Sequence, residues 1–146
     1  MKETSKHHPP LLEQVSDFEN IFFAFHECAK GKRSKKGYQN FLFAYGEKLK
    51  SIELELKRKQ DFYWSGYREF IVHDPKKRTV MAAPFRDRVV HTAIHRVLFP
   101  ILDPTLGART FACRYGMGNH TAARRLLEQL RIMGKNRYCI KLDVRK

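Results

Sequence analysis

The sequence of this chain predicts an α+β fold that is mostly helical, with one small antiparallel β-hairpin and a last strand. Apolar residues recur at spacings of three and four over long stretches, which predicts helices. Two short segments, residues 67–73 and 78–83, flank a turn that contains Asp74 and Pro75, which predicts the hairpin. Apolar and polar residues alternate from Tyr138 to the end, which predicts the strand.

The charge balance indicates a partner made of phosphates. The 146 residues hold 29 Lys and Arg against 15 Asp and Glu, a formal net charge of +14, and the charges run from Lys30 to Lys146 between apolar residues. Such a basic folded surface makes nucleic acid the first candidate, although ribosomal and membrane-surface proteins share this balance. The 42% of hydrophobic residues suffices for the core of one domain, or of a piece of a larger one.

Cysteine content and the N-terminus favour a cytoplasmic protein. Cys28, Cys113 and Cys139 are odd in number and widely spaced, which fits neither a disulfide framework nor a pair of zinc knuckles. No apolar run approaches the roughly 18 residues of a membrane span, and residues 1–15 read as a flexible leader without a signal peptide. We therefore expect no membrane association.

The first half predicts two helices around a cationic loop. Ser16 and Glu19 have the spacing of a capping box, and the helix that follows, residues 18–29, ends before Gly31. The loop of residues 30–37 is rich in Lys, and its glycines let backbone amides approach an anion; a solvated loop is the alternative. One long amphipathic helix is expected over residues 38–60, with its apolar stripe in the core.

The hairpin tip and the following helix carry more cations. Lys76, Lys77 and Arg78 project from a tight turn where they could hold a polyphosphate, and a merely solvated turn is about equally expected. Arg78 is the better phosphate ligand, because a guanidinium fits two oxygens. Asp87 is the expected N-cap of a helix that stops near Pro100.

Two further patterns match no known cofactor motif. His91 and His95 have a zinc-binding spacing, but the HExxH glutamate and an obvious third ligand are missing. Residues 111–120 read as a short strand entering a glycine loop, which is neither a Rossmann fingerprint nor a P-loop, and a helix closing at Gly134 follows. In the last strand Asp143 lies on the open face, where a carboxylate can bind a divalent cation but needs further ligands.

Four segments, taken in order, closely resemble bacterial reverse transcriptases, nearest those of diversity-generating retroelements and group II intron-like enzymes. They are residues 73–78, 83–91, 111–120 and 140–146, and the resemblance runs from about Phe18 to the last residue. It implies that residues 16–136 are the fingers subdomain of a right-hand polymerase. Residues 137–146 would then be its first palm strand, truncated.

The resemblance also implies the site residues. Lys76 and Arg78 match the cations that hold the triphosphate of the incoming dNTP, and Arg114, with the loop of residues 116–120, matches a motif lining the template and nucleotide side of the cleft. Asp143 matches the first catalytic aspartate, which binds both Mg²⁺ ions, with Mn²⁺ as an alternative, and Val144 belongs to the same metal site. The stretch from Arg86 through Asp87 to Arg88 matches one that supports the template.

The implied function is RNA-directed DNA polymerisation by two-metal nucleotidyl transfer, on an RNA template with a DNA or RNA primer. The family's Tyr-X-Asp-Asp strand is not in this sequence, so the isolated chain is expected to be inactive without a palm and thumb polypeptide. A cytoplasmic enzyme encoded by a bacterium or phage, with a possible retroelement accessory protein, fits this family. A stand-alone basic RNA-binding or protein-interaction module, without catalysis, is the alternative.

Overall fold

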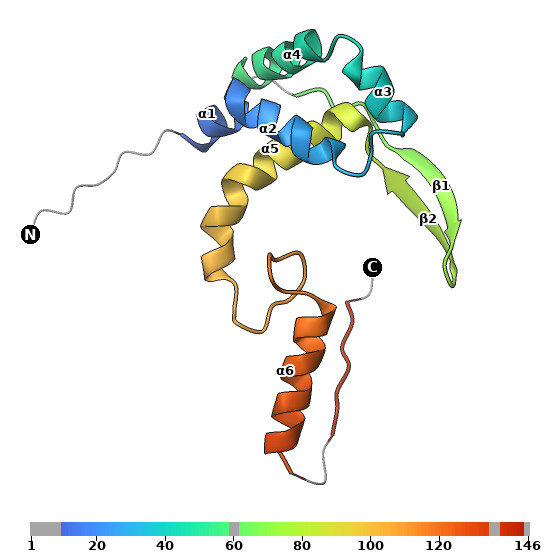
Figure 1. Cartoon of the computed structure of the whole chain (residues 1–146), viewed down its shortest axis with the longest axis vertical. Helices are drawn as coiled ribbons and strands as arrows, with labels where there is room; N and C mark the ends of the chain where they lie inside the picture. The colour runs from blue at the N-terminus through green and yellow to red at the C-terminus, as the bar shows by residue number, and fades with distance from the viewer. Residues whose placement is uncertain (1–9, 59–61, 135–137, 145–146) are drawn as a thin grey trace, which may run out of the picture. The chain divides into compact units, whose positions relative to one another are not determined.

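A computed structural model describes residues 10–58, 62–134 and 138–144 and divides the chain into two units, residues 1–102 and 103–146. The described part has an α+β fold of helices and one two-stranded antiparallel sheet (Figure 1). The first unit contains α1 (Leu11–Ser16), α2 (Phe18–Ala29), α3 (Lys36–Leu42), α4 (Tyr45–Lys57), β1 (Arg68–His73), β2 (Lys77–Ala82) and α5 (Phe85–Leu102). The second contains the short 3₁₀ helix Asp103–Thr105 and α6 (Asn119–Ile132).

Helices α2 and α5 form the centre of the first unit, with α1, α3 and α4 packed around them. Their apolar faces supply the buried core: Ile21, Ala24, Phe25, Phe41, Leu49, Ile52, Phe85, Val89, Val90 and Ala93. The rings of Phe25 and Phe41 stack with centroids 5.7 Å apart, and the ring of Phe85 lies 5.2 Å from that of Phe41. This core holds the first turn of α5 against α3.

The predicted helix over residues 18–29 is confirmed, but its N-cap is Asp17 and not Ser16. The carboxylate of Asp17 accepts a hydrogen bond from the backbone N–H of Asn20 at 3.3 Å. Ser16 is instead the buried last residue of α1, a helix that begins inside the segment expected to be a flexible leader. Burial of Val15 and Ser16 explains why this part of the leader is ordered.

The single helix expected over residues 38–60 is wrong, because α3 and α4 are separate. Ala44 lies between them with φ of 60°, in the left-handed region that ends a helix. The ammonium of Lys48 donates hydrogen bonds to the carbonyl oxygens of Asn40 at 2.5 Å and Phe43 at 2.6 Å, which satisfies the open end of α3. The predicted apolar stripe still enters the core, and its end at Gln60 lies outside the described residues.

The predicted hairpin is confirmed and projects from the helices (Figure 1). Strands β1 and β2 pair antiparallel from Arg68 opposite Ala82 to His73 opposite Lys77. Because side chains alternate between the two faces of a strand, Arg68, Phe70 and Arg78 share one face.

Helix α5 begins at Phe85, before the predicted start, and continues through Pro100 to Leu102. Asp87 therefore lies inside the first turn and is not the N-cap. Its side chain is buried and accepts hydrogen bonds from Ser65, from the backbone N–H at 2.8 Å and the hydroxyl at 3.0 Å. No helix in the described ranges is long and apolar enough to cross a membrane.

In the second unit two predicted strands are not formed. Residues 107–118 make turns before α6, and residues 138–144 pair with no strand in the described part of the chain. The apolar residues that alternate along this segment, such as Ile140 and Leu142, would face a core in a strand, but their side chains are 82% and 88% exposed. A segment of alternating residues forms a strand only where a partner strand shares its hydrogen bonds. The terminal palm strand that the sequence predicted is therefore not formed in the described residues.

Candidate functional site

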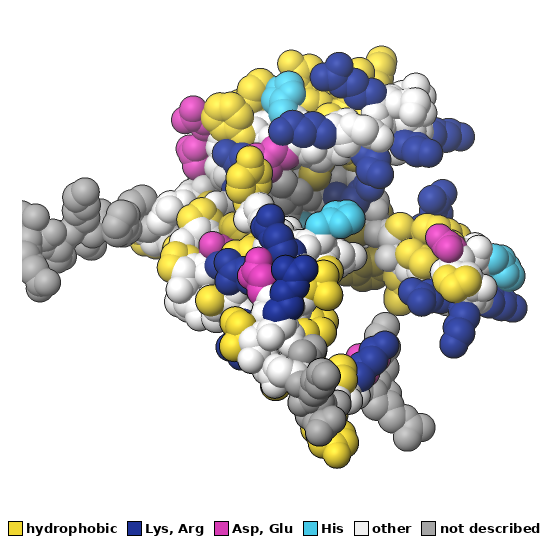
Figure 2. Space-filling model, turned by 60° about the horizontal axis from the view of Figure 1, so that its bottom comes forward, with side chains coloured by type: hydrophobic (Ala, Val, Ile, Leu, Met, Phe, Trp, Pro, Cys, Tyr) yellow, Lys and Arg dark blue, Asp and Glu magenta, His cyan; other side chains and the backbone are white. Residues whose placement is uncertain are grey.

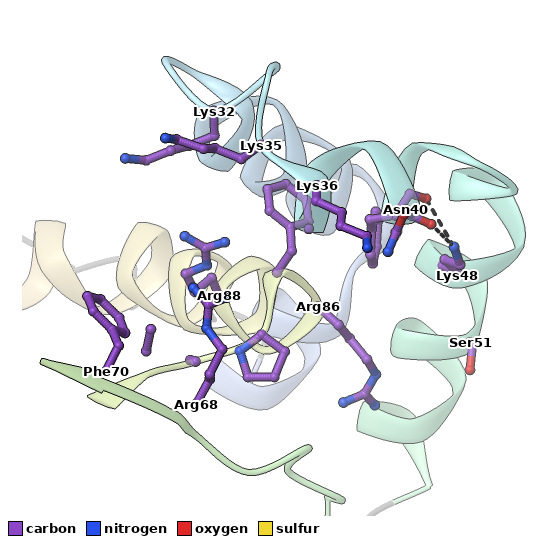
Figure 3. Close-up of a pocket in the computed structure, with 16 residues that line it drawn as sticks. Lys32, Lys35, Lys36, Asn40, Lys48, Ser51, Arg68, Phe70, Arg86 and Arg88 are labelled. Carbon is purple, nitrogen blue, oxygen red and sulfur yellow. Dashed lines mark hydrogen bonds between the residues drawn. The ribbon is translucent and has the colours of Figure 1, made fainter. Parts of the chain in front are cut away.

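A basic cavity of about 880 Å³ lies at the root of the hairpin, within the first unit. Its walls come from the loop after α2, from α3 and α4, from the first residues of β1, and from the start of α5 (Figure 3). It is lined by Lys32, Lys35, Lys36, Gly37, Asn40, Phe41, Lys48, Ser51, Arg68, Phe70, Ala82, Ala83, Pro84, Phe85, Arg86 and Arg88. We call this space the hairpin-root cavity.

All the charged side chains that line the hairpin-root cavity are cationic. It contains seven Lys and Arg side chains, Lys32, Lys35, Lys36, Lys48, Arg68, Arg86 and Arg88, and no Asp or Glu. Like charges in one concave surface repel each other and raise the local concentration of anions. The composition of the cavity therefore favours an anionic ligand.

Two of these seven cations are already engaged. Arg86 forms ion pairs with Glu55 and Asp87, and Lys48 caps the carbonyls at the end of α3. The other five, Lys32, Lys35, Lys36, Arg68 and Arg88, have no ion pair with a carboxylate in the described ranges. These five are the groups with charge to offer a ligand.

Arg88 adds a second indication of a ligand. Its Nε is buried and has no hydrogen-bond partner in the part of the chain that the structure describes, although the guanidinium carbon lies 5.4 Å from the Phe85 ring centroid. A buried donor without an acceptor is costly, but this atom has no surface open to a ligand, so an anion would meet Arg88 at the terminal nitrogen atoms of its guanidinium. Figure 3 shows the Arg88 guanidinium pointing toward the side of the cavity that Lys32 and Lys35 occupy.

The hairpin extends the cationic surface outward. Arg68 and Phe70 line the cavity from β1, and Arg78 lies farther along the same face, opposite Val72. Lys76 is in the turn, and Lys76, Lys77 and Arg78 are all exposed. In Figure 2 the projecting hairpin carries Lys and Arg side chains around apolar ones. The triphosphate role of Lys76 and Arg78 stays a prediction that this exposure permits.

Arg86 and Asp87, expected to support a template strand, form hydrogen bonds within the protein, and their template role stays a prediction. The guanidinium of Arg86 donates to the carbonyl of Tyr63 at 3.0 Å and to Asp87 Oδ1 at 3.1 Å, and it also contacts Glu55. Together with the bonds from Ser65 to Asp87, this network ties the segment before β1 to α4 and α5. Of this stretch, Arg88 is the cation that lines the cavity without an ion pair to a carboxylate in the described ranges.

Arg114, in the second unit, likewise forms hydrogen bonds within the protein. Its three nitrogen atoms make five hydrogen bonds, with the carboxylate and carbonyl of Asp103 and the carbonyls of Gly107 and Thr110. The bond from Nε to Asp103 Oδ1 is 2.7 Å long. In this arrangement every guanidinium N–H is used to organise the loop, so contact with a nucleotide would require these bonds to break.

Asp143 and Val144 are both exposed residues of the second unit. No group of three His, Cys, Asp or Glu side chains close enough to hold a metal occurs among the described residues. The metal role of Asp143 and Val144 stays a prediction. His91 and His95 stack on aromatic rings instead, with centroids 5.0 Å from Trp64 and 4.8 Å from Phe99.

Two cysteine environments differ. Cys28 is half-buried, and its thiol lies 2.9 Å from the hydroxyl of Thr92 and 3.2 Å from the carbonyl oxygen of Arg88. Burial raises the pKa of this thiol above its ordinary value, which makes it a poor nucleophile. Cys113 and Cys139 are exposed.

The sequence interpretation missed several residues of the cavity. It recognised the loop cations but gave no site role to Arg68, Phe70 or Lys48. The period-two pattern of the hairpin could have placed Arg68 and Arg78 on one face. The approach of α3 and α4 to the hairpin root depends on the break at Ala44, for which the sequence carries no obvious signal.

No protein-family model matches this sequence, and no curated protein matches it either.

Proposed function

We propose that this chain is the fingers part of an RNA-directed DNA polymerase, a reverse transcriptase that extends a DNA or RNA primer on an RNA template. Four ordered motifs that resemble this family support the proposal. The observation that carries it in the structure is the cationic face that runs from the hairpin-root cavity to Arg78. A polymerase must hold many phosphates, and cations projected from a hairpin serve that task.

In this proposal the hairpin binds the incoming nucleotide. Arg78 makes a forked contact with two phosphate oxygens, and Lys76 adds a point charge from the turn. The two cations offset the triphosphate charge and hold the α-phosphate in line with the primer hydroxyl.

The catalytic metal fits this chain in part. Asp143 supplies an exposed carboxylate, the hard oxygen ligand that Mg²⁺ prefers, and Val144 offers its backbone carbonyl beside it. Mg²⁺, when bound, activates the primer hydroxyl and neutralises the leaving pyrophosphate. Further carboxylates must come from a palm strand, as the family's Tyr-X-Asp-Asp motif implies.

The test is primer extension with the chain joined, in cis or in trans, to a reverse-transcriptase palm and thumb. We expect Mg²⁺-dependent extension on an RNA template, and Asp143→Asn should reduce it to background because the substitution removes a metal-binding charge. Glu128→Gln, which removes an exposed carboxylate of α6, is the matched control and should leave the rate within about twofold. Full activity of Asp143→Asn would show that this residue is not the catalytic aspartate.

A stand-alone RNA-binding module remains the second candidate, and one observation favours it. The hairpin-root cavity is complete within residues 1–102, so anion binding there needs nothing from the second unit. RNA binding by this chain, combined with no extension in any combination with a palm, would favour this second candidate.

A further inference from the structure

We propose that the hairpin-root cavity binds the sugar-phosphate backbone of single-stranded nucleic acid, and that the bound phosphate fastens the hairpin to the helices. The inference deepens the proposed function by naming a strand-binding site separate from the nucleotide site at the hairpin tip. It does not depend on catalysis. The same cavity would serve either a polymerase or a module that binds RNA alone.

The first argument is charge. Five cations without carboxylate partners in the described ranges converge on one space: Lys32, Lys35, Lys36, Arg68 and Arg88. Salt weakens a single surface charge, but several charges around a concave wall act together on one anion. A phosphodiester chain carries one negative charge per residue and can place successive phosphates along such a wall.

The second argument is the placement of the Arg88 guanidinium. Arg88 Nε has no acceptor in the described part of the chain, while its backbone carbonyl already receives the hydroxyl of Thr92 at 2.9 Å. This donor is held by α5, whose first turn is anchored in the core through Phe85. Because Nε itself has no surface open to the cavity, a phosphate would bind the end of the guanidinium, which Figure 3 shows pointing toward the side of the cavity that Lys32 and Lys35 occupy.

Shape favours a single strand over a duplex. The cavity has a volume of about 880 Å³, within the range of about 300–1,000 Å³ typical of ligand pockets. A flexible strand can place a nucleotide in such a recess, whereas a stiff duplex presents its phosphates on a convex surface. Phe70, 39% exposed with the Arg68 guanidinium 5.5 Å from its ring centroid, offers an unpaired base a surface for stacking.

The coupling to the hairpin follows from where the lining residues come from. Arg68 and Phe70 belong to β1, whereas Lys36 belongs to α3 and Arg88 to α5. The two strands contact each other extensively but make only sparse contact with the helices. A phosphate between Arg68 and the helical cations would replace repulsion across the cavity with attraction on both sides, so a bound strand should restrain the hairpin that presents Arg78.

Strand binding is measured by fluorescence anisotropy of a labelled oligouridylate and of an RNA duplex of equal length, with the full chain in both cases. We expect tighter binding of the single strand. The double variant Lys36→Gln/Arg68→Gln should weaken that binding about tenfold or more and make the log-log salt slope shallower by roughly 1.4, for two lost contacts at about 0.7 each. The matched control, Arg124→Gln/Arg125→Gln, removes two charges from α6 outside the cavity and should have a smaller effect.

Arg88→Lys separates geometry from charge, because it keeps the cation and removes the planar guanidinium that can bind two phosphate oxygens. We expect it to weaken oligouridylate binding severalfold while thermal unfolding stays near that of the wild type. Equal losses in the cavity and control variants would overturn the inference and leave only a diffuse charge effect. So would tighter binding of the duplex, or equal binding to phosphatidylserine vesicles.

Hydrogen exchange tests the coupling. Backbone amides of residues 68–82 should exchange more slowly when oligouridylate is bound, and this protection should be lost in Lys36→Gln/Arg68→Gln. Protection unchanged by the strand would overturn the coupling. Asp143→Asn should bind the strand normally, so failure of the polymerase test and failure of this one are distinguishable.

Discussion

At the scale of single residues, what divides the basic side chains of this protein is whether they have partners. The guanidinium groups of Arg114 and Arg86 donate hydrogen bonds to carbonyl and carboxylate oxygens of the protein itself. Lys35, Lys36 and Arg88 have no such carboxylate in the described ranges, and they face one cavity. A sequence comparison treats all five as equally basic, but only the second group has charge left for a ligand.

Glu53 gives a prediction at this scale. Its oxygens lie 2.7 Å from the Lys50 ammonium and 2.6 Å from that of Lys57, and these hydrogen bonds hold the pKa of the carboxyl below its usual range. Because the folded pKa is lowered, the stabilisation is present above the unfolded pKa and is lost as pH falls through the folded pKa. Glu53→Gln should therefore lower the unfolding free energy at pH 7 by about 0.5 kcal/mol.

Urea unfolding at a series of pH values checks this prediction. The difference between Glu53→Gln and the wild type should be largest near neutral pH and should shrink at acid pH. Glu47→Gln is the control, because Glu47 lies on the same helix and takes part in no ion pair found among the described residues. A difference that stays constant with pH would show that the two lysines contribute little.

At the scale of elements, hydrogen bonds centred on the buried Asp87 tie the segment before the hairpin to the helices, which the strands themselves contact only sparsely. Asp87 in α5 accepts two hydrogen bonds from Ser65, and Arg86 joins the carbonyl of Tyr63 to Glu55 of α4. These bonds hold the segment that enters β1. They also explain why a stretch expected to contact a template contributes to the cavity one cation without a carboxylate partner in the described ranges, Arg88.

We predict that Asp87→Ala destabilises the protein by about 2–3 kcal/mol, because it leaves the donors of Ser65 and Arg86 without their buried acceptor. Amides of residues 68–82 should exchange faster in this variant, since the entry to β1 is no longer held. Urea unfolding and hydrogen exchange measure the two effects. Ser65→Ala, which removes one of these bonds, should cost about 1 kcal/mol; an equal cost for both variants would contradict the network.

At the scale of the whole molecule, the formal charge of +14 predicts binding to nucleic acid that is sensitive to salt. If the five open cations of the hairpin-root cavity each meet a phosphate of a single strand, the log-log slope of affinity against salt should be about −3.5, at roughly −0.7 per contact. Binding should discriminate poorly between sequences, since phosphate contacts carry no base information. Titrations from 50 to 300 mM salt measure the slope, and affinity independent of salt would remove the electrostatic argument.

Local patterns predicted most of the elements of the first unit. The helix over Phe18–Ala29, the hairpin and most of α5 follow from apolar spacing and turn residues within a few positions of one another. The prediction of a strand over residues 138–144 was wrong. A strand needs a partner strand, and the alternation of residues in one segment does not show whether a partner is present. The short strand expected at the start of residues 111–120 is also not formed, and this segment makes turns around Arg114.

The sequence by itself determined the α+β class, the basic character of the surface and the cationic hairpin, because each depends on residues close together in the chain. Only the tertiary structure decided which cations are free. The left-handed turn at Ala44 folds α4 back, and the Asp87 network directs β1, so that Lys36, Arg68 and Arg88, far apart in sequence, line one cavity. Convergence of distant like charges costs free energy in the unbound protein, which is the physical reason that we propose a phosphate ligand for this cavity.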